Sequence, residues 1–328
     1  LMIYVHYDGQ PVAIDQWESG TPWSGELYTA AREKGGEKRP FPGPGEQIDP
    51  EWRIYGRSAS DDKAPFPAIL AVLDALREKG IQPTSNLKFF FEGEEEASSP
   101  HIAEYYDQYK DKLAADAWIV FDGPVHQSGR PLIVYGVRGV AALDITIYGA
   151  VRSLHSGHYG NFAPVPGQMM AHLLASMKDE RGKVLIEGFF DSTAPITEAD
   201  RAAIAAMPAY DGQIRDELGI SWSESDNALL AERLLYPSLT IQGMTSGNTG
   251  KLARNVIPST ASANIGMRLA KGNDPDKMMD LVEEHIRKQG YHIVRREPDM
   301  DTRLAHDKIA LVHRRDGYPA SRTPIDIP

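Results

Sequence analysis

The stretch NLKFFFEGEEE, residues 86–96, runs from an apolar strand directly into a cluster of acids. Three phenylalanines are followed by four carboxylates in five positions, those of Glu92, Glu94, Glu95 and Glu96. Carboxylates this close repel one another, and each loses solvation at the mouth of a buried strand. Either solvent or a bound cation must offset that repulsion, and the rest of the chain favours the cation.

Polar residues also follow the other apolar runs in the first part of the chain. In addition to Glu95 and Glu96, these residues are His6, Asp8, Asp61 and Asp122. In a parallel sheet the carboxyl ends of the strands meet at one edge, which is where such sheets bind ligands. Each motif alone is typical of a solvated strand end or a capped turn, but their coincidence at one edge predicts a functional site.

Composition narrows the class of protein. The chain has 328 residues, of which 41% are hydrophobic and 25% charged, as expected for a globular protein with a sizeable core. A formal net charge of -11 argues against nucleic acid or an anionic membrane as the main partner. No apolar run reaches the roughly 20 residues that a membrane-spanning helix needs. The composition is compatible with either the cytosol or the periplasm.

Cysteine is absent, which excludes disulfides and thiolate metal sites. Any transition metal must be held by histidine and carboxylate, and that ligand set suits zinc, manganese or cobalt.

The first part of the chain alternates strand-like and helical patterns, which predicts an α/β sandwich with a mostly parallel sheet. The expected strands cover residues 1–8, 86–96, 116–124 and 131–139, and the expected helices residues 64–80 and 101–114. Residues 9–52 have no sustained periodicity and read as a long surface excursion.

Near residue 140 the pattern changes to β-α-β-β-α-β, which is typical of a ferredoxin-like α+β lid. Its expected strands cover residues 140–151, 235–243, 260–269 and 291–297, and its helices residues 164–180 and 274–290. We therefore predict a catalytic domain over 1–139, a lid and dimerisation domain over 140–300 with a charged insertion at 181–234, and a return to the catalytic domain over 301–328.

Two divalent cations about 3.5–4 Å apart can polarise a carbonyl and generate a hydroxide nucleophile. Such a pair needs a bridging carboxylate, further histidine or carboxylate ligands, and an acid that handles the proton. The residues that supply nearly this set are His6, Asp61, Glu95, Glu96 and Asp122.

Five motifs in order carry a resemblance to a known family. They are VHYDGQP (5–11), YGRSASDDKAP (55–65), EGEEEASS (92–99), FDG (121–123) and RNVIPSTASANIGMRL (254–269). They resemble the dizinc exopeptidases, the family of carnosinase, glutamate carboxypeptidase and aminoacylase, in which a lid interrupts the catalytic domain. The sequence is identified as a member of that family from residue 1 to about residue 300.

The resemblance implies a role for each residue of the metal centre. His6 and Asp122 would ligate one metal and Glu96 the other, with Asp61 bridging the two. Glu95 would be the general base, and Asp8 would orient His6. The family also implies a cis peptide bond between Asp61 and Asp62.

The resemblance extends to the lid. His155, in LHSGHYG (154–160), would stabilise the oxyanion in the active site of the neighbouring subunit, which implies a homodimer. Arg268 would bind the free carboxylate of the substrate through paired hydrogen bonds, and Asn255 would contact the same region.

One departure concerns a final histidine ligand on the Glu96 side of the metal pair. Neither His306 nor His313 has the surroundings expected of that ligand, so we expect it beyond residue 328. The chain opens inside an apolar strand and ends after residues that still look structured. We expect a fragment that lacks both ends of the catalytic domain.

The motifs therefore predict a metal-dependent peptidase that cleaves dipeptides or small peptides with a free carboxylate. One alternative is a deacylase or N-carbamoyl amidohydrolase with the same centre, because the lid rather than the ligands separates the two. Another is a non-catalytic metal- or peptide-binding protein of the same fold. A two-metal phosphoesterase fits the chemistry but not the lid motifs.

Overall fold

The computed structural model describes residues 1–18, 20–123, 125–126, 130–224 and 228–326. The chain divides into two compact units, Leu1–Val125 and His126–Pro328. Each unit has its own sheet, and we describe them in turn. Within the described residues no helix is long and apolar enough to cross a bilayer.

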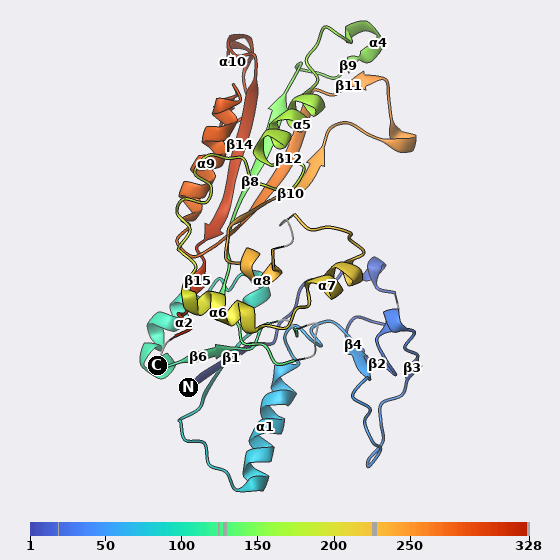
Figure 1. The fold of residues 1–328 in the computed structure, drawn as a ribbon. Coiled ribbons are helices and arrows are strands. Elements are labelled where there is room, and N and C mark those ends of the chain that lie inside the picture. The colour runs from blue at the N-terminus through green and yellow to red at the C-terminus, as the bar shows by residue number, and fades with distance from the viewer. Residues whose placement is uncertain (19, 124, 127–129, 225–227, 327–328) are drawn as a thin grey trace. The chain divides into compact units, whose positions relative to one another are not determined.

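The first unit is built on a three-stranded parallel sheet in the order β5-β1-β6, of which Figure 1 labels β1 and β6. The strands are β1 (Met2–His6), β5 (Lys88–Glu92) and β6 (Trp118–Val120). The apolar run at the start of the chain is the central strand, and Val5 and His6 at its carboxyl end are fully buried. The predicted parallel sheet is confirmed for these three strands, so the acids that follow them share one edge.

The helices of the first unit follow the predicted pattern. Helix α1 (Pro65–Lys79) has a proline in its first turn and ends at Gly80, whose φ of 65° suits glycine. The expected helix over 101–114 is divided at Tyr109 into α2 (Ile102–Gln108) and α3 (Lys110–Leu113).

Residues 9–52, expected to be a surface excursion, contribute most of a small antiparallel sheet in the order β3-β2-β4. Its strands are β2 (Glu26–Tyr28), β3 (Lys38–Arg39) and β4 (Arg53–Tyr55), beside the 3₁₀ turns Ile14–Gln16 and Arg32–Lys34. Strands of two or three residues are too short to give a hydrophobic period, which is why the pattern did not reveal them.

The second unit contains a five-stranded sheet in the order β10-β12-β8-β14-β13. The strands are β8 (Gly139–Tyr148), β10 (Ser238–Thr245), β12 (Thr260–Leu269), β13 (His292–Val294) and β14 (Ile309–Tyr318). Helices α5 (Pro166–Met177) and α9 (Pro275–Lys288) pack on one face and share a single core cluster with the sheet (Figure 1). This is the α+β lid that the sequence predicts.

The sheet differs from the prediction at its fourth strand. The expected strand over 291–297 is β13, but it pairs only with β14, and β14 takes the place beside β8. Strand β14 follows α10 (Met300–Ala305), and its ten residues bring the sheet to Tyr318. The sheet of the second unit therefore continues beyond residue 300, where we expected the lid to end.

The apolar stretch 131–139 does not extend the parallel sheet, and that expectation was wrong. Within it, β7 (Gly136–Val137) pairs antiparallel with β15 (Ser321–Arg322) in the second unit, and Gly139 begins β8. A short apolar run does not reveal which sheet it joins, because any partner strand can bury it.

The segment 181–234 joins α5 to β10 and carries helices α6 (Glu198–Ala206), α7 (Asp211–Leu218) and α8 (Leu230–Arg233). In a second pairing, β9 (Leu154–His155) joins β11 (Val256–Ile257). The short helix α4 (Ser156–Tyr159) follows β9 in the chain, and the 3₁₀ turn Gly250–Leu252 precedes β11.

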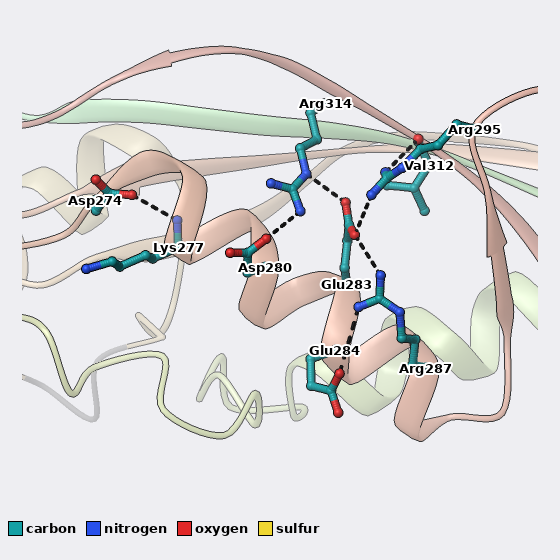
Figure 2. Close-up of polar contacts among 9 residues, drawn as sticks. All are labelled: Asp274, Lys277, Asp280, Glu283, Glu284, Arg287, Arg295, Val312 and Arg314. Carbon is teal, nitrogen blue, oxygen red and sulfur yellow. Dashed lines mark hydrogen bonds and ion pairs between the residues drawn. The ribbon is translucent and has the colours of Figure 1, made fainter.

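One buried carboxylate ties α9 to the strands beside it (Figure 2). Glu283, with 1% of its side chain exposed, accepts hydrogen bonds from Arg314 on β14 (2.7 Å), Arg295 (2.7 Å) and Arg287 (3.1 Å). Burial alone would raise the pKa of Glu283, but the hydrogen bonds and charges of Arg295 and Arg314 lower it to about 2. Three arginines from two strand regions and the helix thus converge on one acid.

We predict that Glu283→Gln lowers the free energy of unfolding by about 2 kcal/mol at pH 7. The substitution leaves three arginines without their shared acid, and their partial exposure to water limits the cost. Because the folded pKa lies below the ordinary value of 4.5, this stabilisation is present above pH 4.5 and is lost as the pH falls toward 2. Urea unfolding followed by circular dichroism at pH 7 and pH 3 measures both effects.

Glu284→Gln is the matched control, because Glu284 lies on the same helix but is 56% exposed and only 3.8 Å from Arg287. It should change the free energy of unfolding by less than about 0.5 kcal/mol. Equal losses for the two variants would contradict the role of Glu283.

Candidate metal centre

The side chain of His6 is the centre of the site in the first unit. It leaves the carboxyl end of β1 and is fully buried. Its Nε2 lies 3.1 Å from Asp61 Oδ1, 3.7 Å from Asp122 Oδ1 and 3.9 Å from Glu95 Oε2. Three carboxylates therefore converge on one imidazole nitrogen.

Three different segments deliver these acids. Asp122 follows β6, and Glu95 opens the 3₁₀ turn Glu95–Ala97 directly after β5. Asp61 comes from the loop before α1, where the peptide bond between Asp61 and Asp62 is cis, as the resemblance implied. The parallel sheet brings its strand ends to one edge, and the loop adds the acid that lies closest to His6.

Asp8 fixes both sides of this arrangement. Its Oδ1 lies 3.1 Å from His6 Nδ1, and its Oδ2 accepts a hydrogen bond of 3.0 Å from the backbone N–H of Glu96. A carboxylate on Nδ1 leaves Nε2 as the nitrogen that can ligate a metal. Asp8 thus orients the imidazole and ties it to the glutamate turn.

The residues fit a cation. The Nε2 atom of His6 is buried and has no hydrogen-bond partner among the described residues. This nitrogen and one carboxylate oxygen from each of Asp61 and Asp122 all lie within 4.8 Å of one another. A buried polar atom normally finds a partner, and imidazole with carboxylates is a ligand set of zinc and related metals.

The acidic surroundings shift the pKa values of the group. Burial raises the pKa of Glu95, and the charge of Asp122 raises it further. Burial also raises the pKa of Asp122, with the charge of His6 opposing and that of Asp61 adding to the shift. For His6, burial works to lower the pKa, but the charges of Asp122, Asp62 and Glu95 outweigh it and leave the pKa raised. The cluster favours positive charge at its centre.

Glu96 does not join the group around Nε2. Its Oε2 accepts a hydrogen bond from Gln10, although its backbone is fixed to Asp8. Sequence reasoning did not single out Gln10, which follows the HYDG motif and has no distinctive signal of its own.

Asp62 was named only for its peptide bond with Asp61 and was given no role in the site. It is 4% exposed, and its Oδ2 accepts a hydrogen bond of 3.3 Å from the backbone N–H of His6. Burial, with the charges of Asp122 and Asp61, raises the pKa of Asp62 to about 6, against the opposing effect of His6. The sequence signal that could have pointed to Asp62 was the pair of adjacent acids, since only one of the two faces the site.

The second unit holds the remaining predicted residues. His155 on β9 pairs with Val256 on β11, and the carbonyl of Asn255 accepts a hydrogen bond of 3.0 Å from Ser156, so His155 and Asn255 lie at one pairing. The Nδ1 atom of His155 accepts from the backbone of Gly157 at 3.1 Å. Arg268 lies near the end of β12 and is exposed.

Comparisons with known proteins support the resemblance. Residues 135–294 match the family model of the peptidase dimerisation domain of M20. An M20 family metallo-carboxypeptidase from Sulfolobus solfataricus superposes with a TM-score of 0.70 at 28% identity, over 99% of this chain and 66% of that one. Residues 135–294 therefore contain the peptidase dimerisation domain of M20, and nearly the whole chain has the fold of an M20 metallo-carboxypeptidase.

Curated relatives are similar over most of the chain. The Cys-Gly metallodipeptidase of Schizosaccharomyces pombe is 27% identical over 292 residues, which cover 88% of this chain and 57% of the relative. The Beta-Ala-His dipeptidase of Mus musculus is 26% identical over 86% of this chain and 54% of its own length. Human carnosine dipeptidase 1 shares the fold, with a TM-score of 0.68 at 22% identity over 99% of this chain and 63% of that one. The chain spans just over half the length of these curated relatives.

A close contact holds the two loops around His6 together. A Cβ atom added to Gly9 would lie 1.9 Å from Ser58 Oγ and 3.2 Å from Ser58 Cβ. Ser58 is buried at a φ of 61°, where glycine is favoured, and its hydroxyl has no partner among the described residues. The loop of His6 and Asp8 thus packs directly against the loop that carries Asp61.

We predict that Gly9→Ala destabilises the first unit by about 2 kcal/mol, because the new methyl group must displace Ser58. Adding Ser58→Gly should recover most of that loss, since it removes the two atoms nearest the methyl group and suits the left-handed backbone. Thermal unfolding of the two single variants and the double variant measures the coupling.

Gly43→Ala serves as the control, because no atom lies within 4 Å of its added Cβ. Additive effects of Gly9→Ala and Ser58→Gly would show that the two loops do not pack as described.

Proposed function

We propose that the protein is a metal-dependent exopeptidase that hydrolyses dipeptides or small peptides with a free carboxylate. The observation that carries this proposal is the buried, unpartnered Nε2 of His6, which faces the carboxylates of Asp61, Asp122 and Glu95. The names of the relatives point the same way, since they are a Cys-Gly metallodipeptidase and a Beta-Ala-His dipeptidase. They favour a peptidase over a deacylase or a binding protein.

We assign two divalent metal ions to the centre, zinc by preference and manganese or cobalt as alternatives. His6 and Asp122 would hold one ion, Glu96 the other, and Asp61 would bridge them. Glu96 would exchange its hydrogen bond with Gln10 for this role. When bound, such ions polarise the scissile carbonyl and lower the pKa of water to about 7.

Glu95 is the general base in this proposal. Its carboxyl lies beside the group, and no side-chain hydrogen bond from the described residues occupies it. Its raised pKa suits a group that both takes and gives a proton. Glu95 accepts a proton from the attacking water and then passes it to the leaving amine. Asp8 keeps the His6 imidazole in the tautomer that leaves Nε2 free to ligate.

The second unit supplies substrate recognition. His155 would donate a hydrogen bond to the oxyanion in the active site of a partner subunit, so the proposal includes a homodimer formed through the dimerisation domain. Arg268 would bind the free carboxylate of the substrate, and Asn255 would contact the same region. Residues 1–139 would thus carry the metal centre and residues 140–300 the recognition groups.

We predict that Glu95→Gln keeps the bound metals and lowers kcat by about 10³-fold, because glutamine is nearly isosteric but cannot accept the proton. Glu94→Gln is the control, since Glu94 is exposed and pairs with His101 at 2.8 Å. Metal content by plasma mass spectrometry and hydrolysis of L-alanyl-L-alanine are measured for the wild type and both variants. Hydrolysis by Glu95→Gln at the wild-type rate would exclude Glu95 as the base.

A metal-loaded wild type that cleaves no dipeptide would overturn the proposed function itself. Fewer than two metals in an active wild type would remove the bridging role of Asp61.

A further inference from the structure

Arg138 lies directly before β8, and its guanidinium reaches across the end of the sheet. Its Nη2 donates to the carbonyl of Tyr236 at 2.8 Å, to Ser238 Oγ at 3.1 Å and, at 3.4 Å, to the carbonyl of Arg268. Ser238 and Arg268 are register partners on β10 and β12. Arg138 thus links the strand of Arg268 to the strand beside it.

The backbone at Arg138 is held in place by the residue that follows. A Cβ atom on Gly139 would lie 2.4 Å from the carbonyl oxygen of Tyr318 and 2.6 Å from the nitrogen of Ala320. Only glycine allows the chain after β14 to approach this closely. The end of β14 therefore fixes the point from which the Arg138 side chain extends.

Arg138, Ser238 and Arg268 form a cluster, here called the arginine corner, on the face of the sheet opposite to α5 and α9. Leu239 and the neighbours Met267 and Leu269 belong to the core cluster under the helices, so alternation places Ser238 and Arg268 on the opposite face. No side-chain hydrogen bond or ion pair of Arg268 is found with the described residues, whereas Arg138 is half-buried with an unpartnered, buried Nε.

The two guanidinium groups repel each other. Burial lowers the pKa of Arg138, and the charge of Arg268 lowers it further, yet an arginine stays protonated in proteins. The chain thus holds a second permanent positive charge beside the exposed Arg268. An anion bound at Arg268 offsets that repulsion, because its negative charge attracts both guanidinium groups.

We propose that Arg138 is a positioning residue for carboxylate recognition at the arginine corner. Its hydrogen bond to the end of β12 positions the guanidinium of Arg268. Its own positive charge adds to the electrostatic attraction on a carboxylate bound there. This inference rests on the proposed role of Arg268 in substrate binding. The ligand class is a small peptide with a free C-terminal carboxylate.

The test compares L-alanyl-L-alanine with its C-terminal amide, which lacks the carboxylate. Binding of each probe is measured by calorimetry on the metal-free protein, where the proposed hydrolysis does not occur, and KM and kcat are measured with metal. We expect Arg138→Gln to weaken binding of the dipeptide roughly tenfold and that of the amide less than twofold. KM for the dipeptide should rise by a similar factor while kcat changes little.

Arg303→Gln is the matched control. Arg303 also donates to backbone carbonyls, those of Gly149 (3.1 Å) and Pro298 (3.3 Å), but it lies near the other end of β8. It should change the binding of neither probe. Ser238→Ala removes one acceptor of Arg138 without changing charge, and it should weaken only the dipeptide, about two- to threefold.

Equal losses of affinity for the dipeptide and the amide in both variants would show that Arg138 is merely structural, and this would overturn the inference. Unchanged affinity in the variants would also overturn it. So would a wild type that binds the dipeptide no better than the amide. The proposed function fails separately. A metal-loaded protein that does not cleave, but whose metal-free form binds the dipeptide selectively through Arg138, supports the inference and refutes the hydrolase.

Discussion

The convergence of carboxylates on one buried imidazole is the constraint on which the first unit depends. Every strand of the parallel sheet is short, and the central one ends in His6, whose Nδ1 faces Asp8 and whose Nε2 makes no hydrogen bond with the described residues. Asp61, Asp122 and Glu95 surround the other nitrogen, and without a cation their mutual repulsion works against the fold. Metal binding would therefore add to the stability of this unit as well as supply its chemistry.

The second unit solves a different electrostatic problem. Glu283 is the one fully buried acid among the described residues of α9. Three arginines of the same chain form ion pairs with it. The charge of Glu283 is balanced within the chain, whereas that of the carboxylates around His6 is not. That contrast is informative, because structural ion pairs are complete without a ligand, whereas sites that bind one keep an unsatisfied group.

The sequence predicted what long, strongly patterned segments determine. Strands β1, β5, β8 and β12 and helices α1, α5 and α9 follow from apolar runs and periods, and the acids after the strands follow from strand direction. Pairing partners were less accessible: β14 enters between β8 and β13, and β7 joins β15. The directions of side chains were the hardest to predict. No sequence pattern shows that Asp62 accepts a hydrogen bond from the backbone of His6, or that Glu96 accepts one from Gln10.

The proposed metal ligands lie in the first unit and the proposed recognition groups in the second. The arginine corner is held by β8, β10, β12 and the end of β14, all within the second unit, and none of its contacts involves a predicted metal ligand. Each proposed role thus rests on contacts inside its own unit. The packing of Gly9 against Ser58 supports the loops around His6 in the first unit, and the hydrogen bonds of Arg138 support the end of β12 in the second.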